Sequence, residues 1–474
     1  MRKTWMIVLV LVVLVGCASG GPKTDFLAIN YQRTAQLEGP DRNPVLVIPG
    51  LLGSTLRDTR NNEFVWGGFD GVSVDPDRPE GLRALALPAA PASDGRVSDD
   101  DGVEPTWVLA RARVKVLGLP FNLNVYAGIL QALGAGGYRD ESLGTAGAID
   151  YGPDHFTCFQ YPYDWRRDIV ESAQLLHRYI AGKRAFVQAE YETRFGIEDA
   201  DVRFDIVAHS MGGLVARYFL MYGDADLPAD GGLPELTWAG ARFVDRVILV
   251  GTPNAGSALS FRNLVNGWSL GFLQPTYSAG LLGTYPSVYQ LMPRNSAAPV
   301  VWRDTGEPVG DLYAPSLWQA QGWGLSSPAA DAELRLLLPD VEDAEQRAAV
   351  GREMQARLLR RAAQFHRAID REASLPENVS LMLVVGDDRK TAAVIGAPRD
   401  GGKVSIYSTG DGDGTVLRSS VLHDLRSDED WRPTLRSPLD YDTALFLPET
   451  HTHLTDSPTF TDNILHWLLE DPRD

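Results

Sequence analysis

Six short apolar segments recur along the chain after residue 43, and amphipathic helical patterns separate them. Their sequences are PVLVIPG (44–50), FTCFQYPYDW (156–165), VRFDIVAHS (202–210), RVILVG (246–251), VSLMLVVG (379–386) and TALFLPE (443–449). Each is too short for a buried helix and fits a buried strand. Strands that alternate with helices predict a mostly parallel sheet covered by helices on both faces.

Two long stretches depart from this alternation, at about 55–113 and 254–374. The first is rich in loop-forming Pro, Gly and Asp, and the second separates two expected neighbouring strands. We expect both to be cap insertions, with helices over residues 329–373 that lead back to the sheet. Insertions of this length commonly carry function.

Within the second insertion, residues 261–293 combine mobile glycines with aromatic side chains. The aromatics are Trp268, Phe272, Tyr277, Tyr285 and Tyr289. Trp and Tyr favour the membrane interface, so the segment is typical of a lid that opens at a lipid surface. The alternative is a cap that packs permanently over the sheet.

The N-terminus MRKTWMIVLVLVVLVGCASG has two basic residues, an apolar stretch and small residues around a cysteine. This is the pattern of a signal peptide, and the stretch is shorter than a membrane span. LVGC resembles a bacterial lipoprotein cleavage site, which predicts a signal peptide over 1–16, lipidation at Cys17, a tether over 17–42 and a catalytic domain over 43–474. The expected location is the cell envelope, and the alternative is a plain secreted protein.

Composition excludes several classes of function. The 474 residues are 44% hydrophobic and carry a formal net charge of −18, so a nucleic-acid backbone would be repelled. The two cysteines, Cys17 and Cys158, are too few for a disulfide framework or a cysteine-based metal site.

The clearest chemical signal is DIVAHSMGGLVARYFL, residues 205–220. An apolar strand runs into Ser210, and a helical pattern begins directly after it. A serine nucleophile on a sharp strand-to-helix turn needs small residues two places to either side, and Ala208 and Gly212 meet that need. The alternative is a serine that merely caps a helix.

A nucleophilic serine needs a base and an acid that orients the base. His451 and His453 follow the last strand, and in an extended chain both would point the same way, so facing does not separate them. Two pairs of residues are candidates for the acid: Asp387 or Asp388, and Asp411 or Asp413. Position after the penultimate strand favours the first pair, whereas flanking glycines favour Asp413. DGDG could instead be a calcium loop, but the further acidic ligands are missing.

Backbone amides after the first strand, in VLVIPGLLGST, could form an oxyanion hole together with the amide of Met211. The alternative is a glycine turn with no chemical role.

Five motifs, in this order, resemble the lecithin:cholesterol acyltransferase and group XV phospholipase family. They are PVLVIPGLLGS (44–54), YPYDWR (161–166), AHSMGG (208–213), GDGTV (412–416) and HL (453–454). The resemblance implies an α/β-hydrolase fold with Ser210 as nucleophile, Asp413 as acid, His453 as base, and Leu52 and Met211 as oxyanion donors. It implies no metal or organic cofactor. The sequence departs from the family in two ways. Ala208 replaces a glycine, and with only Cys17, the expected lipidation site, and Cys158 present, the disulfide of the family's lid cannot form.

The expected function is therefore that of a serine-dependent lipid acyl-ester hydrolase or O-acyltransferase. Its substrate would be a lipid or another ester, and it would meet the membrane through the lipid anchor and the lid. Two alternatives stay open: a non-lipid carboxylesterase, and a catalytically inactive envelope lipoprotein that binds lipid.

Overall fold

The computed structural model describes residues 31–37, 39–67, 74–88, 101–109, 111–116, 119–124, 126–143, 155–269, 275–294, 299–426 and 432–471, with the backbone alone for 111–116 and 119–124. The predicted signal peptide, Cys17 and Phe272 lie outside the described residues.

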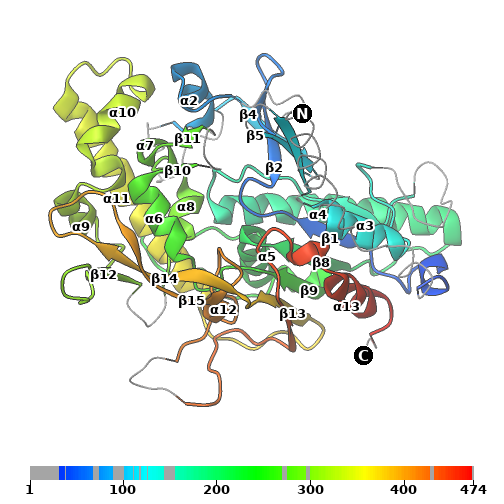
Figure 1. The fold of residues 1–474 in the computed structure, drawn as a ribbon. Coiled ribbons are helices and arrows are strands. Elements are labelled where there is room, and N and C mark those ends of the chain that lie inside the picture. The colour runs from blue at the N-terminus through cyan, green and yellow to red at the C-terminus, as the bar shows by residue number, and fades with distance from the viewer. Residues whose placement is uncertain are drawn as a thin grey trace, which may run out of the picture.

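A six-stranded parallel sheet has the strand order β16-β13-β9-β8-β1-β7. Its strands are β1 (Val45–Ile48), β7 (Cys158–Gln160), β8 (Phe204–His209), β9 (Val244–Val250), β13 (Ser380–Gly386) and β16 (Thr443–Leu447). Strands β1, β8, β9 and β13 are labelled near the centre of the molecule in Figure 1. Every one of the six apolar segments contributes one strand. The predicted parallel sheet is confirmed.

Alternate residues of the central strands enter two separate cores. In β1, Leu46 and Ile48 pack with helices α4 (Ile169–Phe195) and α5 (Met211–Tyr222). Val45 and Val47 point to the other face, where α3 (Ala127–Ala135) and α13 (Pro458–Leu469) cover them. Because successive strand residues face opposite ways, a strand buried on both faces must be apolar throughout, as β1 is.

The first insertion lies between β1 and β7. Its described residues include the three-stranded antiparallel sheet β3-β2-β4, the hairpin β5-β6 and the short helix α2. Their bounds are β2 (Ser54–Asp58), β3 (Phe64–Trp66), α2 (Pro79–Leu85), β4 (Val103–Val108), β5 (Arg111–Val116) and β6 (Leu119–Asn124).

The second insertion lies between β9 and β13. Its elements are α6 (Ala258–Asn266), β10 (Trp268–Ser269), β11 (Thr276–Tyr277), α7 (Ala279–Leu282), α8 (Pro286–Gln290), β12 (Val300–Trp302), α9 (Pro315–Gln321), α10 (Asp331–Leu337) and α11 (Ala344–Ile369). The last two are the helices expected over 329–373. In Figure 1 these elements gather on one side of the central sheet.

A further excursion separates β13 from β16. It contains β14 (Arg389–Ala397), β15 (Ser405–Gly412) and the short helix α12 (Arg418–Val421). β14 pairs with β12 of the second insertion and with β15, which brings the end of β15 back toward the central sheet.

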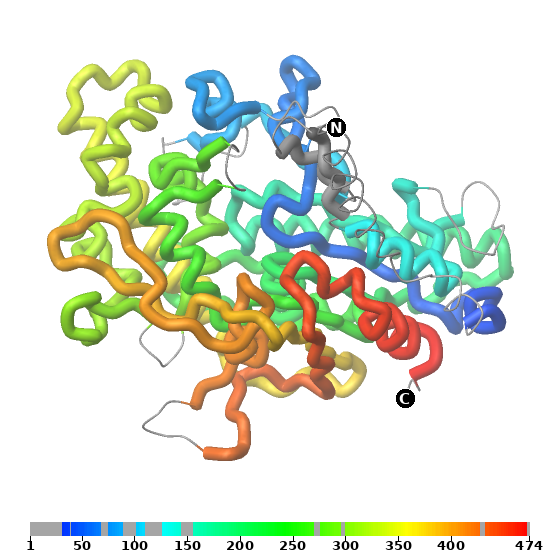
Figure 2. Tube along the Cα trace, in the orientation of Figure 1, coloured from blue at the N-terminus to red at the C-terminus, as the bar shows by residue number. Residues whose placement is uncertain are grey.

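Residues 31–37 and 39–42, expected to belong to the tether, lie against the domain instead. The hydroxyl of Tyr31 donates to the carbonyl of Asp462 in α13, and Arg42 stacks over Tyr138 at 3.9 Å. Figure 2 shows the red C-terminal segment beside the cyan segment that contains α3. Tyr31 and Arg42 pack on the surface that these two segments form. The predicted tether boundary at residue 42 is wrong for this part, because Tyr31 and Arg42 are buried by contacts with distant residues.

Candidate active site

Ser210 lies on a sharp turn between β8 and α5. Its backbone has φ 54° and ψ −127°, a combination that side-chain-bearing residues adopt only under strain. A Cβ at Gly212 would lie 2.3 Å from the carbonyl oxygen of Pro49, and Ala208 is fully buried. The strand, turn and helix predicted around Ser210 are confirmed, and both flanking positions have no room for a large side chain.

A chain of hydrogen bonds joins Ser210 to His451 and Asp413. The Oγ atom of Ser210 lies 2.9 Å from Nε2 of His451, and Nδ1 of His451 lies 2.7 Å from Oδ2 of Asp413. An ionised carboxylate only accepts hydrogen bonds, so Nδ1 carries the proton and Nε2 is free to accept from the serine hydroxyl. A hydroxyl, an imidazole and a carboxylate linked in this order can act as nucleophile, base and orienting acid.

The expectation that His453 would face Ser210 is corrected, because His451 occupies that position. His453 is exposed, and its Nδ1 lies 2.8 Å from the hydroxyl of Thr450. Residues 450–453 form a turn, in which the amide of His453 donates to the carbonyl of Thr450. In a turn, side chains two apart no longer share a face as they do in extended chain, and the two histidines diverge.

Asp413 follows β15 and is 1% exposed. Burial by itself would raise the pKa of its carboxyl group, but His451 and the amides of Val416 and Thr415 lower it, and the net pKa lies below the usual value. Asp413 therefore stays ionised at neutral pH.

Asp413 satisfies both arguments used to choose the acid, namely a position after the penultimate strand and flanking glycines. A Cβ at Gly386, the last residue of β13, would lie 2.5 Å from Cβ of Asp413. Asp413 therefore lies at the end of the penultimate strand, although the β14–β15 hairpin separates the two in sequence. Asp387 and Asp388 follow β13 directly, and Asp388 is exposed at the surface, where it pairs with Arg389.

The loop after β1 lies directly against Ser210. A Cβ at Gly50 would lie 2.7 Å from Cβ of Ser210. The amide of Gly53 donates to the carbonyl of Gly50 and closes a turn in which Leu52 has φ 63°. A leucine held at positive φ indicates a backbone constrained by its surroundings. The assignment of Leu52 and Met211 as oxyanion donors stays a prediction.

A cavity of about 290 Å³ opens at Ser210 and His451. Its lining is mostly apolar and includes no Asp, Glu, Lys or Arg among the described residues. The apolar and aromatic lining residues are Leu51, Leu52, Trp165, Pro253, Leu259, Trp268, Tyr277, Leu282, Tyr285, Val288, Leu291 and Val416. Such a lining suits a hydrocarbon chain.

The aromatics expected in a lid have two different environments. Tyr277, Tyr285 and Tyr289 are buried, which matches a packed cap, whereas Trp268 is half-buried at the cavity. In the described part of the chain no helix is long and apolar enough to cross a membrane.

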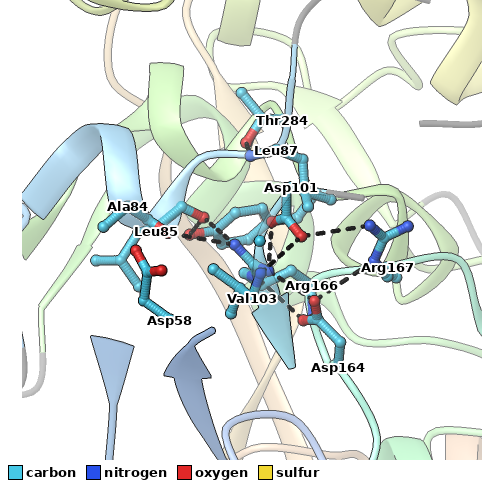
Figure 3. A network of polar contacts seen from close by, with 12 residues as sticks. Asp58, Ala84, Leu85, Leu87, Asp101, Val103, Asp164, Arg166, Arg167 and Thr284 are labelled. Atoms are coloured by element: carbon cyan, nitrogen blue, oxygen red, sulfur yellow. Dashed lines mark hydrogen bonds and ion pairs between the residues drawn. The ribbon is translucent and has the colours of Figure 1, made fainter. Parts of the chain in front are cut away.

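The segment YPYDWR supplies one wall of the cavity and its support. Trp165 lines the cavity, and the next residue, Arg166, is completely buried. Its guanidinium donates to Asp164 and Asp101, at 2.7 Å each, and to the carbonyl of Leu85 at 3.0 Å (Figure 3). These bonds connect the first insertion to the wall of the cavity. The charged residue within the aromatic segment YPYDWR is the feature of the sequence that could have indicated this role.

Among the residues that the structure describes, no group of three or more His, Cys, Asp or Glu could hold a metal ion.

The parallel sheet, the strand-to-helix turn at Ser210 and the covering helices define an α/β-hydrolase fold. Residues 125–318 match the family model of lecithin:cholesterol acyltransferase, so the chain is similar to that family over this segment. The match supports acyl-ester hydrolysis or acyl transfer as the class of reaction.

The chain also resembles solved structures. A chain in the crystal structure of the Tle4–Tli4 complex is similar with a TM-score of 0.54 and 15% identity, over 91% of this chain and 99% of that chain. At this identity the likeness concerns the fold. An aryl esterase candidate from Burkholderia cenocepacia aligns with a TM-score of 0.22 and 10% identity, over 90% of each chain. No curated protein sequence matches the chain.

Proposed function

We propose that the protein cleaves lipid acyl esters through an acyl-enzyme on Ser210. The observation that carries the proposal is the hydrogen-bonded chain Ser210–His451–Asp413 at the mouth of an apolar cavity. A lipid-binding protein without activity would have no need for this chain of contacts.

In the first step the hydroxyl of Ser210 attacks the ester carbonyl while His451 takes its proton at Nε2. Asp413 stays ionised, holds Nδ1–H and stabilises the imidazolium. Collapse of the tetrahedral intermediate breaks the ester bond, and His451 returns the proton to the leaving alcohol. Water or an alcohol then attacks the acyl-enzyme in the same way, which releases an acid or a new ester. Backbone amides of Leu52 and Met211 would stabilise the oxyanion in both steps.

The cavity supports an acyl chain as the part of the substrate that is recognised. Burial of apolar surface contributes roughly 0.8 kcal/mol per methylene group, and the lining offers no charge to hold a headgroup. We therefore infer that the headgroup stays outside the described cavity.

The test is incubation of the purified protein with labelled phospholipid, with and without an alcohol acceptor, followed by identification of the products. Free acid or a new acyl ester supports the proposal and tells hydrolysis from transfer. Turnover of short soluble esters alone, with no gain when micelles form, would indicate a non-lipid esterase. Lipid binding without any turnover would indicate a binding protein and contradict the proposal.

We further propose that Cys17 is lipidated and anchors the enzyme to the cell envelope. Support comes from LVGC after a short apolar segment. Cys17→Ser should abolish palmitate labelling in cells and release the protein from membranes. Wild-type protein that carries no lipid would contradict the anchor without bearing on the chemistry.

A further inference from the structure

His209, directly before the nucleophile, is buried and bonded at both ring nitrogens. Its Nε2 lies 3.0 Å from the carbonyl oxygen of His451, and its Nδ1 lies 3.1 Å from the hydroxyl of Tyr126. The same hydroxyl accepts a hydrogen bond from the amide of Gly50 at 2.6 Å. A buried chain of bonds therefore runs from Gly50 through Tyr126 and His209 to the backbone of His451.

The chemistry of the groups fixes the direction of every bond in this chain. A carbonyl only accepts, so Nε2 of His209 carries a proton and donates to His451. Burial, helped by the nearby His451, lowers the pKa of His209 to about 3, so the ring is neutral and Nδ1 has a free lone pair. Tyr126, whose pKa burial raises, keeps its proton and donates it to Nδ1. Its oxygen is then free to accept from the amide of Gly50.

The chain joins the parts of the site that must be aligned with the nucleophile. Gly50 begins the turn that carries Leu51 and Leu52, and it lies against Ser210. At the other end, the bond from His209 holds the backbone of the histidine whose ring contacts Ser210. The rings of His209 and His451 also pack together, with centroids 4.8 Å apart.

We propose that Tyr126 and His209 are positioning residues, which hold the loop after β1 (residues 50–53) and His451 in alignment with Ser210. This inference rests on the proposed acyl transfer. Catalysis by oriented groups is sensitive to displacements of about 1 Å, which can cost on the order of 100-fold in rate. Two linked buried side chains that contact both loops are well suited to prevent such displacements.

The test compares Tyr126→Phe, His209→Gln and the double variant, with a soluble acyl ester as substrate. His209→Gln keeps a donor for the carbonyl of His451 but provides a poorer acceptor for the hydroxyl of Tyr126. Tyr126→Phe removes that hydroxyl and leaves the ring in place. We expect each single variant to lower kcat by about 10- to 100-fold with KM changed less than about threefold. The double variant should lose clearly less than the product of the two single losses, because both substitutions break one chain.

A second readout separates positioning from general damage. A trifluoromethyl ketone forms an adduct on the serine that mimics the oxyanion, so its affinity should fall in parallel with kcat/KM. Thermal unfolding shows which variants are folded. If Tyr126→Phe does not fold, His209→Asn is a second variant that tests the same chain of hydrogen bonds. Tyr222→Phe is the matched control: it removes a buried hydroxyl that donates to the carbonyl of Ala368 and lies at the far end of α5 from Ser210.

Unchanged kcat in both single variants, losses confined to KM, or losses that multiply in the double variant would overturn the inference. Failure of the proposed function would look different. Ser210→Ala would then keep its activity, whatever the result at Tyr126 and His209.

Discussion

Gly50→Ala places one methyl group against Ser210. Gly50 does not have a positive φ, so alanine can adopt its backbone and the effect is purely steric. The new Cβ would lie 2.7 Å from Cβ of Ser210 and 3.2 Å from its Oγ. Carbon atoms in favourable contact are about 3.5–4.0 Å apart, so one side must move by roughly 1 Å.

The strained turn and the start of α5 hold Ser210, and the chain through Tyr126 holds Gly50, so neither side can move without displacing a reacting group. A displacement of about 1 Å predicts a loss in kcat/KM on the order of 100-fold. Overpacking of this kind typically lowers stability by about 1–3 kcal/mol.

The assay is kcat/KM on a soluble ester, together with the rate of fluorophosphonate labelling and the free energy of unfolding. Gly182→Ala is the matched control, because a Cβ there meets nothing within 4 Å in the middle of α4. That variant should keep full activity and gain up to about 1 kcal/mol of stability. A folded Gly50→Ala enzyme with near-normal kcat/KM would refute the reasoning, because the loop would then not be held against Ser210.

Three further predictions concern the acid, the base and acid sensitivity. Asp413→Asn should lower kcat by about 10⁴-fold through the wrong histidine tautomer, whereas Asp387→Asn should do much less; the reverse ranking in steady-state assays would contradict the assignment. His451→Gln should abolish turnover, and His453→Gln should leave it within a few-fold, which the same assays check. Burial lowers the pKa values of four histidines to about 3 or 4: His155, His209, His366 and His423. The unfolded chain binds these protons below about pH 6.5 and the folded chain does not, so stability should be full above pH 6.5 and fall by about 1.4 kcal/mol per histidine at pH 5.5. Urea unfolding at pH 7.5 and pH 5.5 measures this, and equal free energies would contradict it.

The sheet could be predicted because its strands are short, mainly apolar segments separated by helical patterns, and β1 is apolar on both faces. The turn at Ser210 could also be predicted, because small residues at 208 and 212 report a local backbone constraint. The choice between His451 and His453 could not, since it depends on whether residues 450–453 are extended or turned. Tyr126 was missed for a different reason: its contacts with Gly50 and His209 are distant in sequence, and nothing local marks them.

The boundary of the tether illustrates the same limit. Tyr31 and Arg42 are ordinary residues in a polar segment, and only their contacts with Asp462 and Tyr138 show that they pack on the domain. Asp413 is the intermediate case. Its flanking glycines suggested a shaped loop, but the hairpin that returns it to the end of β13 is a tertiary feature.

Labelling of Ser210 with a fluorophosphonate probe tests the central claim most directly. Wild-type protein should carry the probe on Ser210 alone, and Ser210→Ala should lose both the label and ester hydrolysis, down to a floor of roughly 10³-fold over the reaction in water. Near-normal turnover of a lipid ester by Ser210→Ala would contradict the account, because the acyl group could then not pass through this serine.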